Sequence, residues 1–207
     1  MRHSILDQLP RYDRYMGGKG GLAVGYPWLS IGAIVALEQY ILRPELHRRE
    51  TPEQMASRLP KRYLEFGSGG STVFFARRVE YVRSFETDPK WEPMTRQYLE
   101  EHGLTDKVEL TLQPLTEAMS LVAALPNDSF DIMLVDHADP LLPRGKIVDR
   151  LPLAMVGLPK LKMTGWLVVD NYAMHGMQNF DYAGWAVWHF DDMRYSGRGT
   201  LIARRKA

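Results

Sequence analysis

Cysteine is absent from the 207-residue sequence, and its absence excludes three kinds of chemistry. Disulfide bonds, thiolate metal sites and a cysteine nucleophile all require the missing residue. Long apolar runs are also missing, because the longest, residues 31–37, is far shorter than the ~20 residues that span a bilayer. No basic-then-apolar signal pattern follows Met1. We therefore expect a cytoplasmic protein that does not enter a membrane.

Neither sign of charge dominates, since 26 Lys and Arg residues stand against 25 Asp and Glu residues. This balance provides no general attraction to nucleic acid or to anionic membranes. We therefore expect a small-molecule partner and no nucleic acid. The length suits one domain with a sizeable core. The Met-rich helical patterns are compatible with a homo-oligomer but leave the oligomeric state open.

Two segments differ in pattern, and we place their boundary between residues 59 and 60. Residues 1–59 contain a glycine-rich stretch and then apolar residues at helical spacing, which predicts an N-terminal helical or lid segment. Residues 60–207 alternate between apolar runs and amphipathic stretches. The expected strands are 63–66, 79–85, 108–112, 130–135 and 166–169, and the expected helices are 71–78, 88–103, 115–125 and 144–158.

This alternation predicts right-handed crossovers and a parallel sheet covered on both faces. The last two apolar runs, 185–190 and 200–203, are joined by a short glycine-containing link, so we expect an antiparallel hairpin there. The predicted fold is α/β: a doubly wound, mostly parallel seven-stranded sheet with a C-terminal antiparallel hairpin, in three α/β/α layers. Within it we expect Asp88 to cap a helix, Pro152 to bend one, and Gly165 to form a turn.

The strongest functional signal is a glycine loop between a predicted strand and a predicted helix. Glycine lets the backbone approach a ligand closely, and a helix N-terminus presents free N–H groups. Glu86 ends the next strand about 20 residues on, where a carboxylate accepts hydrogen bonds from ribose hydroxyls. The pattern predicts an adenosine-containing ligand; the alternative is a tight turn beside a surface acid. The loop comprises Gly67, Ser68, Gly69, Gly70 and Ser71.

Two further residues distinguish between adenosine ligands. A dinucleotide fingerprint requires glycine or alanine at the position of Thr72, where it lets the helix pack on the strand. Glu65 would repel a pyrophosphate but suits the positively charged ammonium and sulfonium of S-adenosylmethionine. A nicotinamide-dependent oxidoreductase is therefore the less favoured alternative.

From about residue 60 onward the sequence resembles the class I S-adenosylmethionine-dependent methyltransferases. The resemblance is carried by the E-x-G-x-G loop, the acid after the second strand and the terminal hairpin. It implies that the loop contacts the methionine part of the cofactor and that Glu86 holds the ribose. It also implies methyl transfer to a small molecule, at oxygen; an S-adenosylmethionine-binding module without transferase activity is the alternative. The implied cofactor-binding residues are Glu65, Gly67, Ser68, Gly69, Gly70, Ser71, Glu86 and Asp136.

Acidic side chains also end two later strands. Asp136 follows one, and Asp170 and Asn171 follow the next. Because neighbouring strands lie about 4.8 Å apart, these oxygen-bearing side chains can converge, and such a set suits Mg²⁺. The pairing is similar to the catechol and caffeoyl-CoA type of O-methyltransferase, which implies a divalent metal that chelates vicinal hydroxyls of the substrate. The alternative is that these acids cap helices or contact the cofactor amine.

The resemblance breaks down at the general base. Those enzymes carry a Lys shortly after the first Asp, whereas here the first Lys is Lys146. We name Asp136 and His137 as catalytic candidates and leave the general base open, with Asp139 as a further option. His175 is a weaker candidate for the same cleft. The aromatic run Tyr26-Pro27-Trp28 suits a substrate lid.

Overall fold

The computed structural model describes residues 25–42, 51, 53, 59–138, 149–173, 176–191 and 199–206. The candidate residues Asp139 and His175 lie outside these ranges, as does Lys146. So does most of the link within the hairpin. Among the described residues, no helix combines the length and apolar character needed to cross a membrane.

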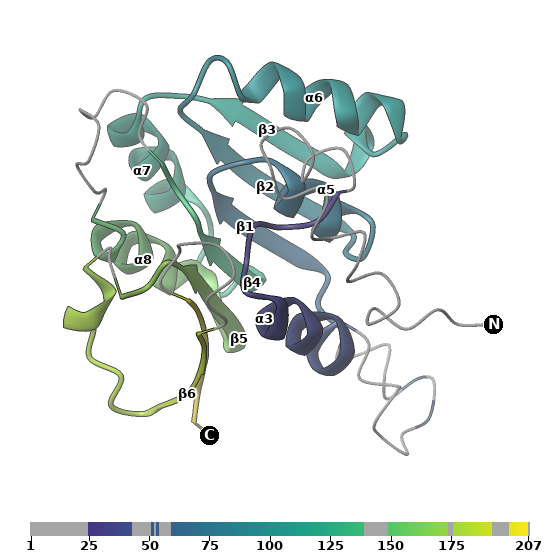
Figure 1. Ribbon diagram of the computed structural model, residues 1–207. Helices are drawn as coiled ribbons and strands as arrows, with labels where there is room; N and C mark the ends of the chain where they lie inside the picture. The colour runs from purple at the N-terminus through teal and green to yellow at the C-terminus, as the bar shows by residue number, and fades with distance from the viewer. Residues whose placement is uncertain are drawn as a thin grey trace.

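A seven-stranded sheet forms the centre of the molecule, in the order β3-β2-β1-β4-β5-β7-β6 (Figure 1). Strands β1 to β5 pair in parallel, and β7 runs antiparallel to both of its neighbours. The predicted parallel sheet with a terminal hairpin is confirmed. The strands are β1 (Arg62–Phe66), β2 (Tyr81–Glu86), β3 (Val108–Leu112), β4 (Phe130–Val135), β5 (Leu161–Asp170), β6 (Trp185–Phe190) and β7 (Thr200–Arg205).

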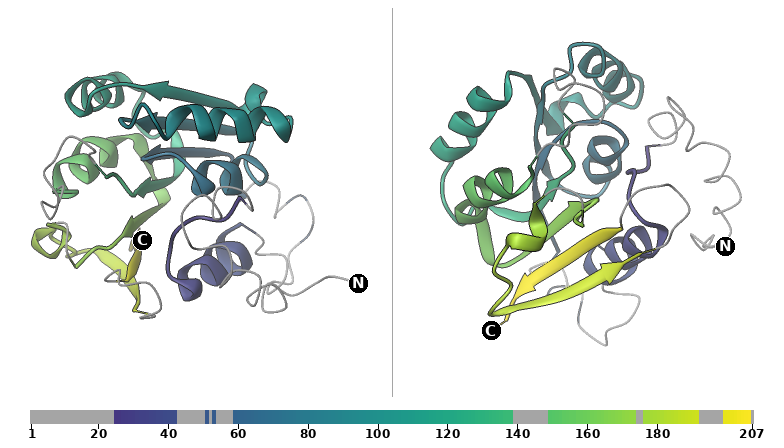
Figure 2. Two further views of the ribbon diagram at one scale, coloured as in Figure 1. Left: turned by 45° about the horizontal axis from the view of Figure 1, so that its top comes forward. Right: turned by 60° about the vertical axis from the view of Figure 1, so that its left-hand side comes forward.

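Helices cover both faces of the sheet, and the two faces form separate apolar clusters (Figure 2). Strand β4 shows why: Ile132 and Leu134 belong to one cluster, whereas Met133 and Val135 belong to the other. This alternation is the two-residue period of a strand buried on both sides. One face carries α3 (Ile31–Ala36), α5 (Gly70–Ala76) and α6 (Glu92–Glu101); the other carries α7 (Leu115–Ala124) and α8 (Leu151–Gly157).

The helix expected from residue 88 begins four residues later. The Asp88 carbonyl accepts hydrogen bonds from the amides of Trp91 and Glu92, and its carboxylate accepts one from the Lys90 amide at 2.8 Å. Asp88 therefore organises a turn ahead of α6 and does not cap the helix. Pro93 takes the first-turn position instead, where its missing N–H leaves no unmade bond.

Two further expectations about single residues were wrong. Pro152 lies in the first turn of α8, so it begins this helix and does not bend it. Gly165 lies inside β5 and does not precede it. The β4–β5 register shifts there, because Phe130 pairs with Leu161 while Ile132 pairs with Trp166. The extra residues of β5 form an irregularity that accommodates the glycine.

The segment 25–42 packs into the same core as the sheet. Leu29, Ile34 and Leu37 are buried in one cluster with Ile202 of β7. A π-helical turn (Leu37–Ile41) continues α3. Hydrogen bonds fix the segment at its start, because the Ser30 amide donates to Thr200 Oγ1 at 2.9 Å and Ser30 Oγ donates to the Phe190 carbonyl at 2.7 Å. The proposed boundary at residue 60 stays a prediction.

Candidate functional site

A cavity of about 260 Å³ opens at the carboxyl ends of β1, β2 and β4. Ligands of open parallel sheets bind at this edge, where the loops after the strands converge. Seven of the eight cofactor-binding residues implied from sequence line it, together with four others. The lining residues are Trp28, Gly67, Ser68, Gly69, Gly70, Ser71, Glu86, Asp88, Trp91, Asp136 and Ala138.

The glycine loop requires its glycines at two positions. Gly67 has φ of 91° and Gly69 has φ of 146°, a region that L side chains rarely adopt. A Cβ atom on Gly67 would overlap the carbonyl oxygen of Asp136, which follows the neighbouring strand. The loop after β1 and the loop after β4 thus touch through their backbones. A residue larger than glycine at position 67 would push these two loops apart and widen the base of the cavity.

Glu65 lies beneath this loop and does not line the cavity. Its side chain is fully buried and accepts hydrogen bonds from the hydroxyls of Tyr63, Ser71 and Thr72. Thr72 Oγ1 in turn accepts the Gly69 amide at 2.9 Å. Burial raises the pKa of Glu65 to about 7, against the opposing effect of these hydroxyls. The carboxylate therefore shapes the loop from the protein side.

Glu86 accepts four hydrogen bonds, and two of them come from the glycine loop. One carboxylate oxygen accepts the amide and the hydroxyl of Ser68, each at 2.8 Å. The other accepts the amides of Thr87 at 2.8 Å and Asp88 at 2.9 Å. Ser68 Oγ also lies 3.2 Å from Thr95 Oγ1, so its hydroxyl has a second partner available.

A buried guanidinium joins the two strand-end acids. Arg150 Nη2 lies 3.0 Å from Asp136 Oδ1, and Arg150 Nη1 lies 4.0 Å from Asp170 Oδ2. The same group donates to the backbone carbonyls of His137 and Asp170. The Arg150 side chain is 4% exposed, against 24% for that of Asp136. Burial raises the pKa of both carboxyl groups, and Arg150 opposes this rise.

Asp170 and Asn171 are not among the residues that line the cavity. Asp170 Oδ1 accepts the Thr200 hydroxyl at 3.0 Å, and Asp170 Oδ2 accepts the Asn171 amide. Asn171 adopts φ of 49°, a left-handed conformation that asparagine tolerates better than most residues. Both carboxylate oxygens of Asp170 are therefore occupied by protein donors.

These residues do not fit a divalent metal ion. Within the described parts of the chain, no group of three or more His, Cys, Asp or Glu side chains is arranged to hold one. The two carboxylates of the predicted triad instead face a permanently charged guanidinium. A dication placed between them would be repelled by that charge at close range.

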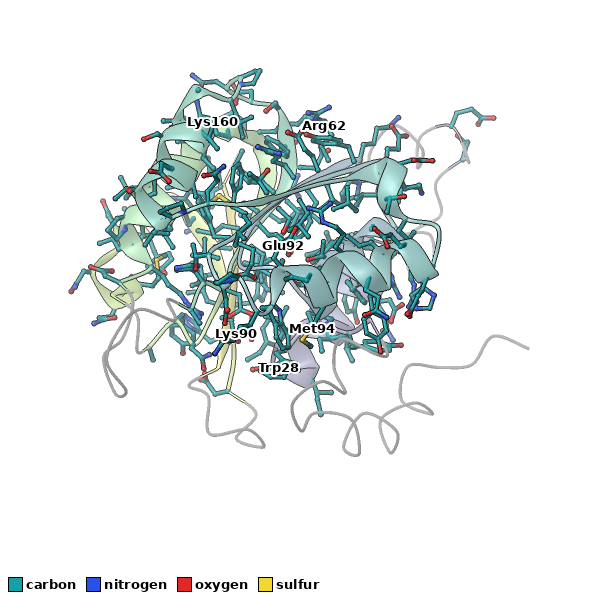
Figure 3. The ribbon with its side chains drawn as sticks, turned by 90° about the horizontal axis from the view of Figure 1, so that it is seen from above. Trp28, Arg62, Lys90, Glu92, Met94 and Lys160 are labelled. Carbon is teal, nitrogen blue, oxygen red and sulfur yellow. The ribbon has the colours of Figure 1, made fainter. Side chains whose placement is uncertain are left out.

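Of the remaining candidates, Trp28 lines the cavity and His137 is buried in the interior of the protein. His137 is 1% exposed and does not line the cavity, although its carbonyl accepts Arg150. Trp28 lies beside the start of α6 (Figure 3), with its ring centroid 6.0 Å from that of Trp91. Trp91 Nε1 donates to the Ser68 carbonyl at 2.7 Å. The two indoles thus form one side of the cavity.

Sequence reasoning did not assign four of these residues to the site: Asp88, Trp91 and Ala138 of the lining, and Arg150. The signal for Arg150 was indirect, because two buried acids require a nearby cation. Arg144, Lys146 and Arg150 all follow Asp136 closely, and nothing in their spacing selects one of them.

The sequence itself matches no protein-family model and no curated protein. Solved structures do resemble the fold. A protein from Klebsiella pneumoniae assigned as an O-methyltransferase aligns with TM-score 0.60 and 16% identity, over 100% of this chain and 92% of that chain. An O-methyltransferase from Bacillus cereus in complex with S-adenosylhomocysteine aligns with TM-score 0.58 and 15% identity, over 98% and 90%.

A third similar structure is the O-methyltransferase TomG from Streptomyces achromogenes, in complex with S-adenosylmethionine. It aligns with TM-score 0.56 and 16% identity, over 80% of this chain and 86% of that chain. The chain therefore has the α/β fold of the class I methyltransferases.

Proposed function

We propose that the protein is an S-adenosylmethionine-dependent methyltransferase that acts on a small molecule at oxygen. One observation carries the proposal: the cavity lining holds three carboxylates and, among the described residues, no Lys or Arg. A pyrophosphate ligand would meet Glu86, Asp88 and Asp136, and Arg150, which pairs with Asp136, is not part of the lining. This lining argues against a dinucleotide. A ligand with a sulfonium and an ammonium group suits the same lining.

The cavity residues have distinct proposed roles. The backbone from Gly67 to Ser71 holds the methionine part, with Glu65 fixing the loop from below. Glu86 binds the ribose, and Trp28 and Trp91 provide an apolar wall for the adenine. Binding at Glu86 requires a ribose hydroxyl to replace the Ser68 hydroxyl, which then turns to Thr95.

Asp136 is proposed to meet the methyl acceptor. It lines the cavity beside Gly67, and its carboxylate remains partly exposed. When bound, S-adenosylmethionine supplies an electrophilic methyl group, which passes to the acceptor oxygen as the sulfur–carbon bond breaks. Asp136 orients the acceptor hydroxyl and takes its proton, and the surrounding wall excludes water. His137 has a positioning role, through its carbonyl bond to Arg150.

The structures of similar fold support this proposal, since two of them were solved with S-adenosylmethionine or its demethylated product. The balanced charge supports a small-molecule acceptor over nucleic acid. A cytoplasmic location and a homo-oligomeric state remain predictions from sequence.

Calorimetric titration with S-adenosylmethionine tests the proposal. We expect one binding site per chain, no binding of a nicotinamide dinucleotide, and methyl transfer to at least one hydroxyl compound in an acceptor panel. Glu86→Ala should weaken binding by at least ~10-fold, because two hydroxyl bonds to a charged acceptor are lost. Ser68→Ala is the matched control, and its affinity should stay within ~3-fold of wild type since its hydroxyl competes with the ribose.

No binding at millimolar S-adenosylmethionine would refute the cofactor assignment. Unchanged affinity in Glu86→Ala would refute the ribose contact alone. Binding without turnover on any acceptor would favour a binding module over an enzyme.

A further inference from the structure

We propose that Arg150 supplies, from within the chain, the positive charge that a divalent metal ion would otherwise place between Asp136 and Asp170. The inference rests on the proposed methyltransferase function for its consequence: the acceptor is held without chelation, so it needs a single hydroxyl and no vicinal pair.

The geometry of the guanidinium supports this assignment. Its two terminal nitrogens face two different carboxylates, one at 3.0 Å and the other at 4.0 Å. Its remaining donors are directed to the carbonyls of His137 and Asp170, which follow β4 and end β5. One side chain thus joins the ends of two neighbouring strands, as a bound cation does with its oxygen ligands.

The burial of the group makes the replacement permanent. Arg150 is 4% exposed, and a guanidinium keeps its positive charge in proteins. Mg²⁺ requires near-octahedral oxygen ligands at about 2.0–2.1 Å. The Arg150 guanidinium already lies within 4.0 Å of both carboxylates that such an ion would have to bridge.

The arrangement also affects how many hydroxyl groups the methyl acceptor needs. Asp136 is the member of the cluster that lines the cavity, and Arg150 holds it from the protein side. A chelating metal would need two substrate oxygens, whereas a fixed carboxylate needs one hydroxyl donor. Arg150 is therefore a positioning residue: it orients Asp136 and has no direct contact with the substrate.

Titration with Mn²⁺, followed by electron paramagnetic resonance, tests the assignment. The wild type should show no stoichiometric binding at millimolar Mn²⁺. Arg150→Gln should gain one Mn²⁺ site, because two carboxylates then lose their shared cation. Arg78→Gln is the matched control: it removes an arginine from an ion pair with the single carboxylate of Glu38, and it should gain none. A purely structural role for Arg150 would not create a metal site.

Methyl transfer by the wild type should also be unchanged by EDTA and by added Mg²⁺, on an acceptor with one hydroxyl. Stoichiometric Mn²⁺ binding by the wild type, or loss of turnover in EDTA, would overturn the proposal. So would a folded Arg150→Gln protein that binds no Mn²⁺. If this variant does not fold, the Mn²⁺ titration of the wild type and the EDTA experiment test the proposal without it. Titration with S-adenosylmethionine tests the proposed function separately, because absence of binding would refute that function and leave the Mn²⁺ result to be judged by itself.

Discussion

The Glu65 carboxyl group is fully buried, and the donors of its hydrogen bonds are hydroxyl groups. Its raised pKa, about 7, means that the folded state holds the proton more tightly than the unfolded state does. Stability from this group is therefore complete below pH ~4.5 and is lost as the pH rises through 7.

This difference predicts a pH dependence that one substitution removes. Between pH 5 and pH 8 the free energy of unfolding of the wild type should fall by about 3 kcal/mol relative to Glu65→Gln. Glutamine preserves the shape of the side chain and carries no titrating charge. Urea unfolding of both proteins at several pH values measures the difference. Parallel stability curves would show that Glu65 titrates normally despite its burial.

Single residues also mark the limit of prediction from sequence. Gly67 and Glu86 were identified because a local pattern, a strand followed by a glycine turn, fixes where they lie. Arg150 was not identified, because its partners Asp136 and Asp170 lie on other elements and only the folded sheet brings them together. Asp88 shows the same limit at short range, since a turn and a helix cap have the same residue preferences.

At the scale of elements, Lys160 links the start of β5 to the end of α7. It is buried, and its Nζ donates to the carbonyls of Ala123 and Leu125 and to the Asn127 side chain. A cation at a helix C-terminus satisfies carbonyls that have no partner within the helix. Figure 3 shows Lys160 far from Trp28, which lines the cavity.

Lys160→Met should therefore lower stability without affecting the site. We expect a loss of about 2–3 kcal/mol, since buried acceptors lose their donor. Lys162→Met is the matched control. It breaks a partly exposed ion pair with Asp131 and should cost less than ~1 kcal/mol. Affinity for S-adenosylmethionine should be unchanged in both, and a large change would place Lys160 in communication with the cavity.

The strands were predictable because burial on both faces gives β4 an apolar run from Ile132 to Val135. Helix boundaries were less predictable. The start of α6 depends on whether Asp88 or Pro93 begins the first turn, and both are common there. The irregularity at Gly165 follows from the β4–β5 register, which no local pattern in β5 reveals.

Across the whole molecule, a chain of hydrogen bonds connects the segment 25–42 to the strand-end acids. Ser30 donates to Thr200, Thr200 donates to Asp170, and Asp170 lies against Arg150. Thr200 is fully buried in β7, the strand that reverses direction. The reversal thus brings the segment and the site together.

Thr200→Val should loosen this connection. Valine matches threonine in shape but leaves the Ser30 amide and Asp170 Oδ1 without a partner, so we expect a loss of about 1–3 kcal/mol. Hydrogen exchange of residues 30–37 should become faster. Thr200→Ser keeps the hydroxyl and should restore slow exchange. Equal exchange in all three proteins would show that apolar packing alone holds the segment.

The contact between Ser30 and Thr200 has a consequence for the growing chain. The two residues are 170 positions apart, so a ribosome working at about 5–20 residues per second needs roughly 10–30 seconds to make the second after the first. Throughout this interval Leu29, Ile34 and Leu37 have no completed sheet to cover them. The segment is made early, yet its contact with β7 can form only near the end of synthesis.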